Sequence, residues 1–264
     1  MTNGPLLPAE AALLIEPKRS TASQCIQAAL LTLLGRGHIA IEEQGRLLKT
    51  RYLRLRPGDG EPLPRHLAVL KNALDIYTRF GMVRSDQAVR SLQKAFGNDF
   101  RKYVHDILAP PLISQGLLKR EERKFLGLIP YFHYERTTAG EAKARPLIRL
   151  LDEAGGIKQL IRDDPDRAIR IAQMAGVLLV LSPAAKAQIP KLKALMADRG
   201  SDGGGAYYVD GSSDDSEWQV GVDFGSFDFS ADVGGWLDSI GSVGDFTGGD
   251  GGGDGGGDGG GGGD

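Results

Sequence analysis

The C-terminal stretch of the chain constrains its folding more than any other feature. Residues 201–264 contain 23 glycines, 13 aspartates and one glutamate, and they contain no lysine or arginine. Such a segment buries too little apolar surface to offset the conformational entropy lost on folding. We therefore expect a disordered acidic tail over residues 201–264. Residues 1–200 remain for the folded part, enough for one domain with a sizeable core.

The charges of the chain are distributed unevenly between these two parts. The tail takes 14 of the 34 acidic residues and none of the 32 lysines and arginines. Residues 1–200 therefore hold 32 basic against 20 acidic side chains, a net charge of about +12. A basic domain favours anionic partners, such as phospholipid or nucleic acid. The acidic tail is then a tethered intramolecular partner that competes for the same surface.

Cysteine usage and hydropathy bear on the cellular setting. Cys25 is the only cysteine, so an internal disulfide and a cysteine-based zinc site are both excluded. The N-terminus has no charged and then apolar signal pattern. The longest apolar run, Ile171 to Leu181, is shorter than the roughly 18–20 residues that cross a bilayer. We expect a cytoplasmic protein whose contact with a membrane is peripheral.

Apolar residues at helical spacing dominate residues 1–200, and alternating residues predict two hairpins, at 39–55 and 117–137. The fold class expected is an all-α helical bundle with one or two small, winged-helix-like β-hairpins, followed by the disordered tail. The main helices are expected at residues 22–34, 67–77, 85–96, 98–109, 138–154, 165–181 and from 183 onward.

Local signals refine several of these helices. Asn98 is expected to cap the helix at 98–109, and Pro110-Pro111 to break or kink it. Thr138 to Glu141 has the spacing of a capping box. Asp164 and Ser182 each precede a proline and are expected to cap the last two helices. The helix at 165–181 is apolar nearly all round, so we expect it to be the central buried helix.

The sequence shows no constellation typical of an enzyme. It has no glycine-rich phosphate loop before a helix, no nucleophile elbow and no paired histidines on a helix face. The Gly/Asp repeats of the tail lack the ligand spacing of a calcium loop. We therefore predict no catalytic residue, no metal site and no cofactor.

The segment at 119–136 is the most informative one for function. Basic residues flank a loop tip of six large apolar side chains, and a clustered exposed apolar patch marks a partner surface. An ordinary hairpin packed on the domain is the alternative. The candidate membrane-inserting residues are Phe125, Leu126, Leu128, Ile129, Tyr131 and Phe132. The candidate headgroup-binding residues are Arg101, Lys102, His105, Lys119, Arg120, Arg123 and Lys124.

Four short motifs carry a resemblance to a known family. They lie at residues 28–39, 112–118, 124–128 and 164–167. Over about residues 8–185 the chain resembles the Golgi phosphoprotein 3 family, including its bacterial members. The resemblance implies a helical bundle with a hydrophobic hairpin that enters the membrane. It also implies a basic pocket for phosphatidylinositol 4-phosphate and service as an adaptor between membrane and other proteins.

The sequence departs from the family at the implied lipid pocket. Lys102 and His105 stand where the family has two arginines, and Pro17 and Ile26 fall where it has a tryptophan and an arginine. Membrane attachment is therefore better supported than phosphoinositide specificity. A weaker similarity connects the chain to the cytosolic region of uncharacterised bacterial membrane proteins that have a glycine-rich tail.

The leading functional hypothesis is a peripheral membrane-binding adaptor, not an enzyme. It docks on anionic, phosphoinositide-like headgroups through its basic face and hydrophobic hairpin. One alternative is a winged-helix nucleic-acid-binding protein in which the helix at 98–109 reads a groove, although an aliphatic hairpin tip suits lipid better than phosphate. Another is a protein-interaction scaffold without lipid binding. The tail is expected either to solubilise the protein or to fold residues 218–236 over the lipid-binding face.

Overall fold

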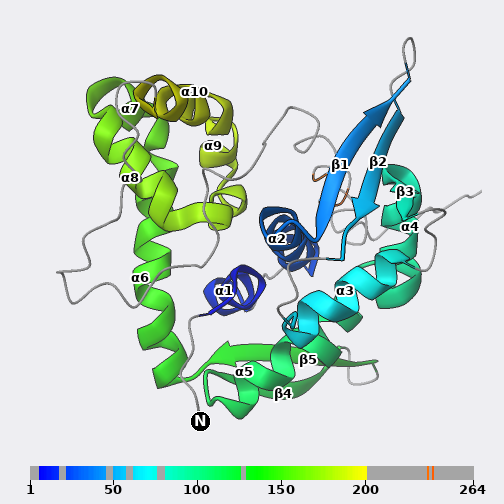
Figure 1. Cartoon of the computed structure of the whole chain (residues 1–264). Coiled ribbons are helices and arrows are strands. Elements are labelled where there is room, and N and C mark those ends of the chain that lie inside the picture. Colours follow the sequence, from blue (N-terminus) through cyan, green and yellow to red (C-terminus); the bar gives the residue numbers. More distant parts are fainter. Residues whose placement is uncertain are drawn as a thin grey trace, which may run out of the picture.

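The structure is a computed structural model that describes residues 6–17, 22–45, 50–57, 62–75, 81–125 and 129–200, together with Leu237 and Ile240. These residues form a bundle of helices with two small antiparallel sheets, which confirms the predicted fold class (Figure 1). The remainder of the predicted tail lies outside the described residues. The division of the chain at residue 200 stays a prediction.

The helices surround a central pair. The pair consists of α1 (Pro8–Ile15) and α2 (Ala22–Gly35). On one side in Figure 1 lie α6 (Thr138–Gly155), α7 (Ile157–Asp163), α8 (Pro165–Ala175), the 3₁₀-helix η2 (Gly176–Leu181), α9 (Pro183–Lys186) and α10 (Ile189–Gly200). On the other side lie α3 (Arg65–Asp75) and α4 (Ser85–Phe96). The first sheet stands beside them.

The central buried helix is α2, and the expectation that residues 165–181 fill this role was wrong. Along α2, nearly every side chain from Ala22 to Leu33 is buried. The segment at 165–181 is instead divided at Gly176, whose φ of +50° ends α8 and begins η2. Helix α8 also has an exposed face, on which Met174 is 50% exposed. Apolar content alone did not reveal this break.

The first sheet contains the predicted hairpin and one further strand. Strands β1 (Ile39–Gln44) and β2 (Thr50–Leu55) pair antiparallel, and β3 (Met82–Arg84) adds to the free edge of β2. The alternation of Ile39 and Ile41 predicted the hairpin. A strand as short as β3 shows no alternation, so the sequence did not reveal it.

The helix caps largely follow the sequence signals. Asp164 and Ser182 accept hydrogen bonds from backbone N–H groups three residues later, as predicted. The predicted box at α6 begins one residue early, because the hydroxyl of Thr137, and not of Thr138, accepts from the N–H of Gly140 at 3.0 Å. The cap sets where α6 leaves the second sheet.

Two residues of the predicted tail belong to the apolar core, and one of them contacts α2. Leu237 and Ile240 are helical and fully buried, and both belong to the main apolar core. The side-chain amide of buried Gln27 donates a hydrogen bond to the carbonyl of Leu237. An unsatisfied buried amide costs about 1–3 kcal/mol, so this carbonyl stabilises Gln27 in its apolar surroundings. At these two positions the chain is ordered.

Gly140 is required where α6 meets the second sheet. A Cβ atom at this position would lie 1.9 Å from the carbonyl oxygen of Leu117, so Gly140→Ala must move backbone. We expect a loss of about 1–3 kcal/mol in the free energy of unfolding. The control is Gly155→Ala in the same helix, where no atom lies within 4 Å and alanine should gain up to about 1 kcal/mol. Urea unfolding measures both, and equal stability of the two variants would contradict the expectation.

Candidate membrane-binding site

The helix that precedes the second hairpin begins with a constrained turn. Phe100 is fully buried with φ +58°, a left-handed conformation that costs about 1–3 kcal/mol outside glycine. Asp99, and not the predicted Asn98, caps the helix, since its carboxylate accepts from the N–H of Arg101 at 3.1 Å. The same carboxylate pairs with the Arg101 guanidinium at 3.0 Å. Burial of Phe100 and the Asp99 cap together fix the direction in which Arg101 and Lys102 leave the core.

The helix that was expected to break or kink at Pro110-Pro111 continues without a gap, but it changes from a π-helix to an α-helix just before the prolines. Residues 103–108 form the π-helix η1 (Tyr103–Leu108), and α5 (Ala109–Ser114) follows without a gap. The N–H of Ala109 donates to the carbonyl of Val104, five residues back. A π turn is wider than an α turn and shifts the hydrogen-bond register. Pro110 and Pro111 then fall in the first turn of α5, where a missing N–H is tolerated.

The predicted hairpin is present as β4 (Leu118–Phe125) and β5 (Ile129–Arg136), which pair from Leu118 opposite Arg136 to Phe125 opposite Ile129. Its base is fastened to the core. The Arg136 guanidinium donates to the carbonyl of Ile15 at the end of α1 at 2.8 Å and pairs with Glu141 of α6 at 2.6 Å. The hairpin is therefore positioned by α1 and α6.

One face of the hairpin packs on η1, and we call it the helix-side face. His105 Nδ1 lies 2.7 Å from the hydroxyl of Tyr134. The ring of Phe132 meets His105 edge to face at 5.4 Å between centroids. The guanidinium of Arg120 lies 4.6 Å from the centre of the Phe132 ring, within the range of a cation–π interaction. By strand alternation, Glu122 and Lys124 belong to the same face as Arg120, so this face carries two cations and one carboxylate from β4.

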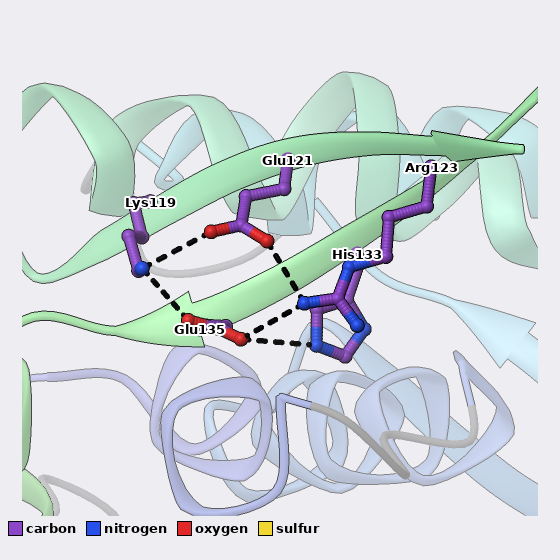
Figure 2. A network of polar contacts seen from close by, with 5 residues as sticks. All are labelled: Lys119, Glu121, Arg123, His133 and Glu135. Atoms are coloured by element: carbon purple, nitrogen blue, oxygen red, sulfur yellow. Dashed lines mark hydrogen bonds and ion pairs between the residues drawn. The ribbon is translucent and has the colours of Figure 1, made fainter.

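The opposite face carries a charge network, shown in Figure 2. Lys119 pairs with Glu121 at 3.1 Å and with Glu135 at 2.7 Å. Arg123 pairs with the same two carboxylates at 2.9 and 3.2 Å, and His133 lies 3.4 Å from Glu135. The hydrogen bond from Arg123 is the largest cause that lowers the pKa of Glu121. The hydrogen bond to Glu135 is the largest cause that raises the pKa of Lys119.

The predicted headgroup-binding residues lie partly on the face with the charge network and partly on the helix-side face or at the start of its helix. Lys119 and Arg123 are engaged with carboxylates of the network face. Arg101, Lys102, Arg120 and Lys124 are exposed. Within the described part of the chain, Lys102, Arg120 and Lys124 form no ion pair. The helix-side face and the start of its helix therefore present the available positive charge.

His105 adds no cation near neutral pH. Burial is the largest influence on its ring and lowers its pKa from the usual 6.5. The nearby Asp106 and Asp99 oppose this shift, while the guanidinium groups of Arg101 and Arg120 reinforce it. Burial also raises the pKa of the Tyr134 hydroxyl. His105 therefore connects helix and hairpin as a neutral ring.

The predicted apolar tip is described only in part. Phe132 is 41% exposed, one of the large apolar side chains exposed on the described surface. Phe125, Ile129 and Tyr131 are described as backbone of β4 and β5 but not in their side chains. Leu126 and Leu128 lie outside the described residues. Insertion of the tip remains a proposal.

Sequence reasoning missed Tyr134 and the carboxylates of the network. Tyr134 was counted as part of a basic and apolar stretch, although it anchors His105. Glu121 and Glu135 cancel charges that the composition of the segment counts as available. The signal was the position of Glu121 between Lys119 and Arg123 on one face of β4, which becomes informative only once the register places Lys119 opposite Glu135.

Two features of the described residues bear on the class of protein. No helix in the described residues is both long and apolar enough to span a bilayer. The same residues contain no cluster of three or more histidine, cysteine, aspartate or glutamate side chains arranged to hold a metal ion. What the described part presents is a helical bundle from which a two-faced hairpin extends.

The described residues define a helical protein that carries a two-stranded hairpin beside its bundle. The family model for Golgi phosphoprotein 3 (GPP34) matches residues 11–203, most of the chain. The chain therefore belongs to the Golgi phosphoprotein 3 family, as the sequence motifs indicated. The family is associated with membrane-related adaptor roles and is non-enzymatic. Among curated proteins, none matches the chain.

The depressed pKa of His105 predicts a pH dependence of stability. A ring that is held neutral in the fold contributes stability above its unfolded pKa of about 6.5, and this contribution is lost as the pH falls through the lower folded value. The free energy of unfolding should therefore fall below pH 6.5, and less steeply for His105→Gln. Lys102→Gln, on the exposed side of the same helix, should keep the native slope. Identical slopes for His105→Gln and the native protein, measured by urea unfolding from pH 7.5 to 5, would disprove the assignment.

Proposed function

We propose that this protein is a peripheral membrane-binding adaptor that docks on anionic lipid headgroups. The contact face contains the helix-side residues Arg120 and Lys124, the start of the preceding helix with Arg101 and Lys102, and the apolar tip of the hairpin. The observation that carries the proposal is the division of the hairpin into a neutralised face and a face with available cations. Membership of the Golgi phosphoprotein 3 family supports it.

The magnitudes agree with reversible binding. Each basic side chain near an anionic leaflet contributes about 1 kcal/mol, and each large apolar side chain that inserts contributes about 1.5–3 kcal/mol. Three or four cations with two or three inserted side chains exceed the cost of ordering a short loop, but they do not approach the stability of a transmembrane helix. A protein held in this way exchanges between membrane and solution.

The arrangement around His105 argues against a strict family lipid pocket. The family's second arginine position holds His105, which is half-buried and hydrogen-bonded to Tyr134. Ile26, at another family pocket position, is fully buried in α2. The proposal therefore specifies anionic headgroups by charge. Selectivity for a phosphoinositide is the finer hypothesis, which vesicles containing phosphatidylinositol 4-phosphate test separately from vesicles containing phosphatidylserine.

The two faces of the hairpin provide a matched experiment on charge. Arg120→Gln with Lys124→Gln removes two available cations and should weaken flotation with phosphatidylserine vesicles about 30-fold, from about 1 kcal/mol each. Lys119→Gln with Arg123→Gln removes two cations of the same strand whose charges Glu121 and Glu135 already offset. This control lowers the net charge by the same amount and leaves Glu121 and Glu135 unpaired on the opposite face, so it should weaken binding much less than the first pair does.

Salt and competitors complete this test. Raised salt should weaken native binding, because exposed charges are screened beyond about 8–10 Å at physiological ionic strength. Equal loss in both double variants would place the contact elsewhere. Binding to neutral phosphatidylcholine vesicles as strong as to anionic ones would disprove the proposal. Preferential capture by duplex DNA in the same mixture would favour the nucleic-acid alternative.

The apolar tip is tested by Leu126→Asp with Leu128→Asp. Two charges at the tip should abolish flotation with anionic vesicles because a carboxylate is costly to bury in lipid. The thermal midpoint should stay within a few degrees of the native value. Met174→Asp on α8 is the control for an exposed apolar residue away from the hairpin, and it should bind normally. Native affinity of the tip variant would show that the tip does not insert.

A further inference from the structure

His105 lies within the proposed contact face, between the helix and the hairpin. Its Nδ1 atom is 2.7 Å from the hydroxyl of Tyr134, and its ring centroid is 5.4 Å from that of Phe132. Phe132 is 41% exposed, and the guanidinium of Arg120 lies 4.6 Å from the centre of the same ring. A half-buried histidine is thus held among the side chains that are proposed to meet the membrane. Histidine is the side chain whose charge changes most readily near neutral pH.

Burial and charges of both signs act on this ring. Burial is the largest influence and lowers the pKa of His105. Asp106 and Asp99, on the same helix and at its start, favour the charged ring, while Arg101 and Arg120 oppose it. The ring is therefore neutral at pH 7 in the free protein, although two carboxylates beside it already favour the proton.

The titratable groups on the core side of η1 act on a different residue. Burial, and then Cys25 of α2 and Glu10 of α1, raise the pKa of the Tyr103 hydroxyl. Tyr103 donates in turn to the backbone carbonyl of His66 in α3. Helix α5, which follows η1, contains no charged residue. The charges that act on His105 therefore lie on the outer side, with the hairpin and the proposed membrane surface.

The contact between His105 and Tyr134 is compatible with both charge states of the ring. A tyrosine hydroxyl donates to a bare ring nitrogen and accepts from a ring N–H. The Nδ1 atom of His105, at 2.7 Å, can therefore keep this partner when the ring takes up a proton. Protonation then adds a positive charge to the contact face without detaching the helix from β5.

We propose that His105 is a proton-dependent headgroup ligand, neutral in the free protein and cationic when the contact face meets an anionic leaflet. Acidification then strengthens membrane attachment, and a rise in pH weakens it. This inference rests on the membrane-binding function proposed above and concerns the regulation of that same face.

An anionic leaflet favours the proton in two ways. Phosphate oxygens close to the ring stabilise its charged form, as opposite charges within about 4–6 Å do. The negative surface potential of the leaflet also concentrates protons near it. Because linkage is reciprocal, the factor by which the leaflet strengthens proton binding is the factor by which the proton strengthens leaflet binding. One further cation near the leaflet corresponds to about fivefold tighter binding.

The first test compares flotation at pH 7.5 and 5.5. The vesicles contain phosphatidylcholine and phosphatidylglycerol, whose phosphodiesters keep their charge over this range. The native protein should bind about fivefold more tightly at pH 5.5, from the charge of one additional cation. His105→Gln should match the native protein at pH 7.5 and lack this increase. His105→Arg, which is charged at both values, should bind at pH 7.5 about as tightly as the native protein does at pH 5.5.

The control for the other titrating groups is a histidine on the opposite face of the hairpin. His133 lies 3.4 Å from Glu135 in the charge network (Figure 2), so His133→Gln should keep the native increase at pH 5.5. An increase in His105→Gln equal to that of the native protein would overturn the proposal.

The same measurements separate this inference from the proposed function. Preference for phosphatidylglycerol over pure phosphatidylcholine vesicles, weakened by Arg120→Gln with Lys124→Gln, supports membrane binding at either pH. If that preference is present and the pH profiles of the native protein and His105→Gln coincide, only the role of His105 is refuted. If the native protein binds phosphatidylglycerol vesicles at neither pH, both proposals are refuted.

The second test follows the proton itself in the native protein, so it does not depend on the folding of a variant. Nuclear magnetic resonance of the His105 ring is recorded from pH 8 to 5 in the free protein and with lipid nanodiscs. Phosphatidylglycerol nanodiscs should raise the pKa of the ring by at least about 0.5, and phosphatidylcholine nanodiscs should leave it unchanged. An unchanged pKa in protein bound to phosphatidylglycerol nanodiscs would overturn the proposal.

Discussion

The structure depends on the nearly complete burial of α2. This helix has apolar or small side chains on nearly all sides, and such a helix is stable in water only when neighbours surround it. Helices α1 and α3, both short helices η1 and η2, and strand β1 all contact it. The two halves of the molecule in Figure 1 meet there. The arrangement of the domain therefore follows from the packing of the other helices and strand β1 around α2.

Packing against this core positions the candidate membrane site. Helix η1 contacts α2, and α1 packs along α2 and receives Arg136 from the base of the hairpin. Helix and hairpin are therefore oriented by the same buried element, and His105 with Tyr134 joins them directly. Because exposed ion pairs contribute little stability, the network on the other face acts mainly by neutralising Lys119 and Arg123. The pairing of charges thus decides which face can attract an anionic surface.

Features with a local cause were predictable from the sequence. The spacing of apolar residues revealed α2, the alternation at 39–55 and 117–137 revealed both hairpins, and Asp164 and Ser182 revealed two helix starts. Features that depend on contact with another segment of the chain were not predictable from the sequence. Which face of β4 meets Glu135 follows from its register with β5, and the π turn ends where the N–H of Ala109 bonds the carbonyl of Val104, just before Pro110. Neither is encoded in a window of neighbouring residues.

Leu237 and Ile240 show the same limit most clearly. Averaged over residues 201–264, composition predicts disorder, because the segment cannot bury enough surface by itself. Leu237 and Ile240 are nevertheless buried in the main apolar core, where Gln27 of α2 donates a hydrogen bond to the carbonyl of Leu237. The order of these two residues therefore depends on the core into which they pack. A composition average cannot detect it, whereas two aliphatic residues at helical spacing in a glycine-rich background are a signal for which a receiving helix face can be sought.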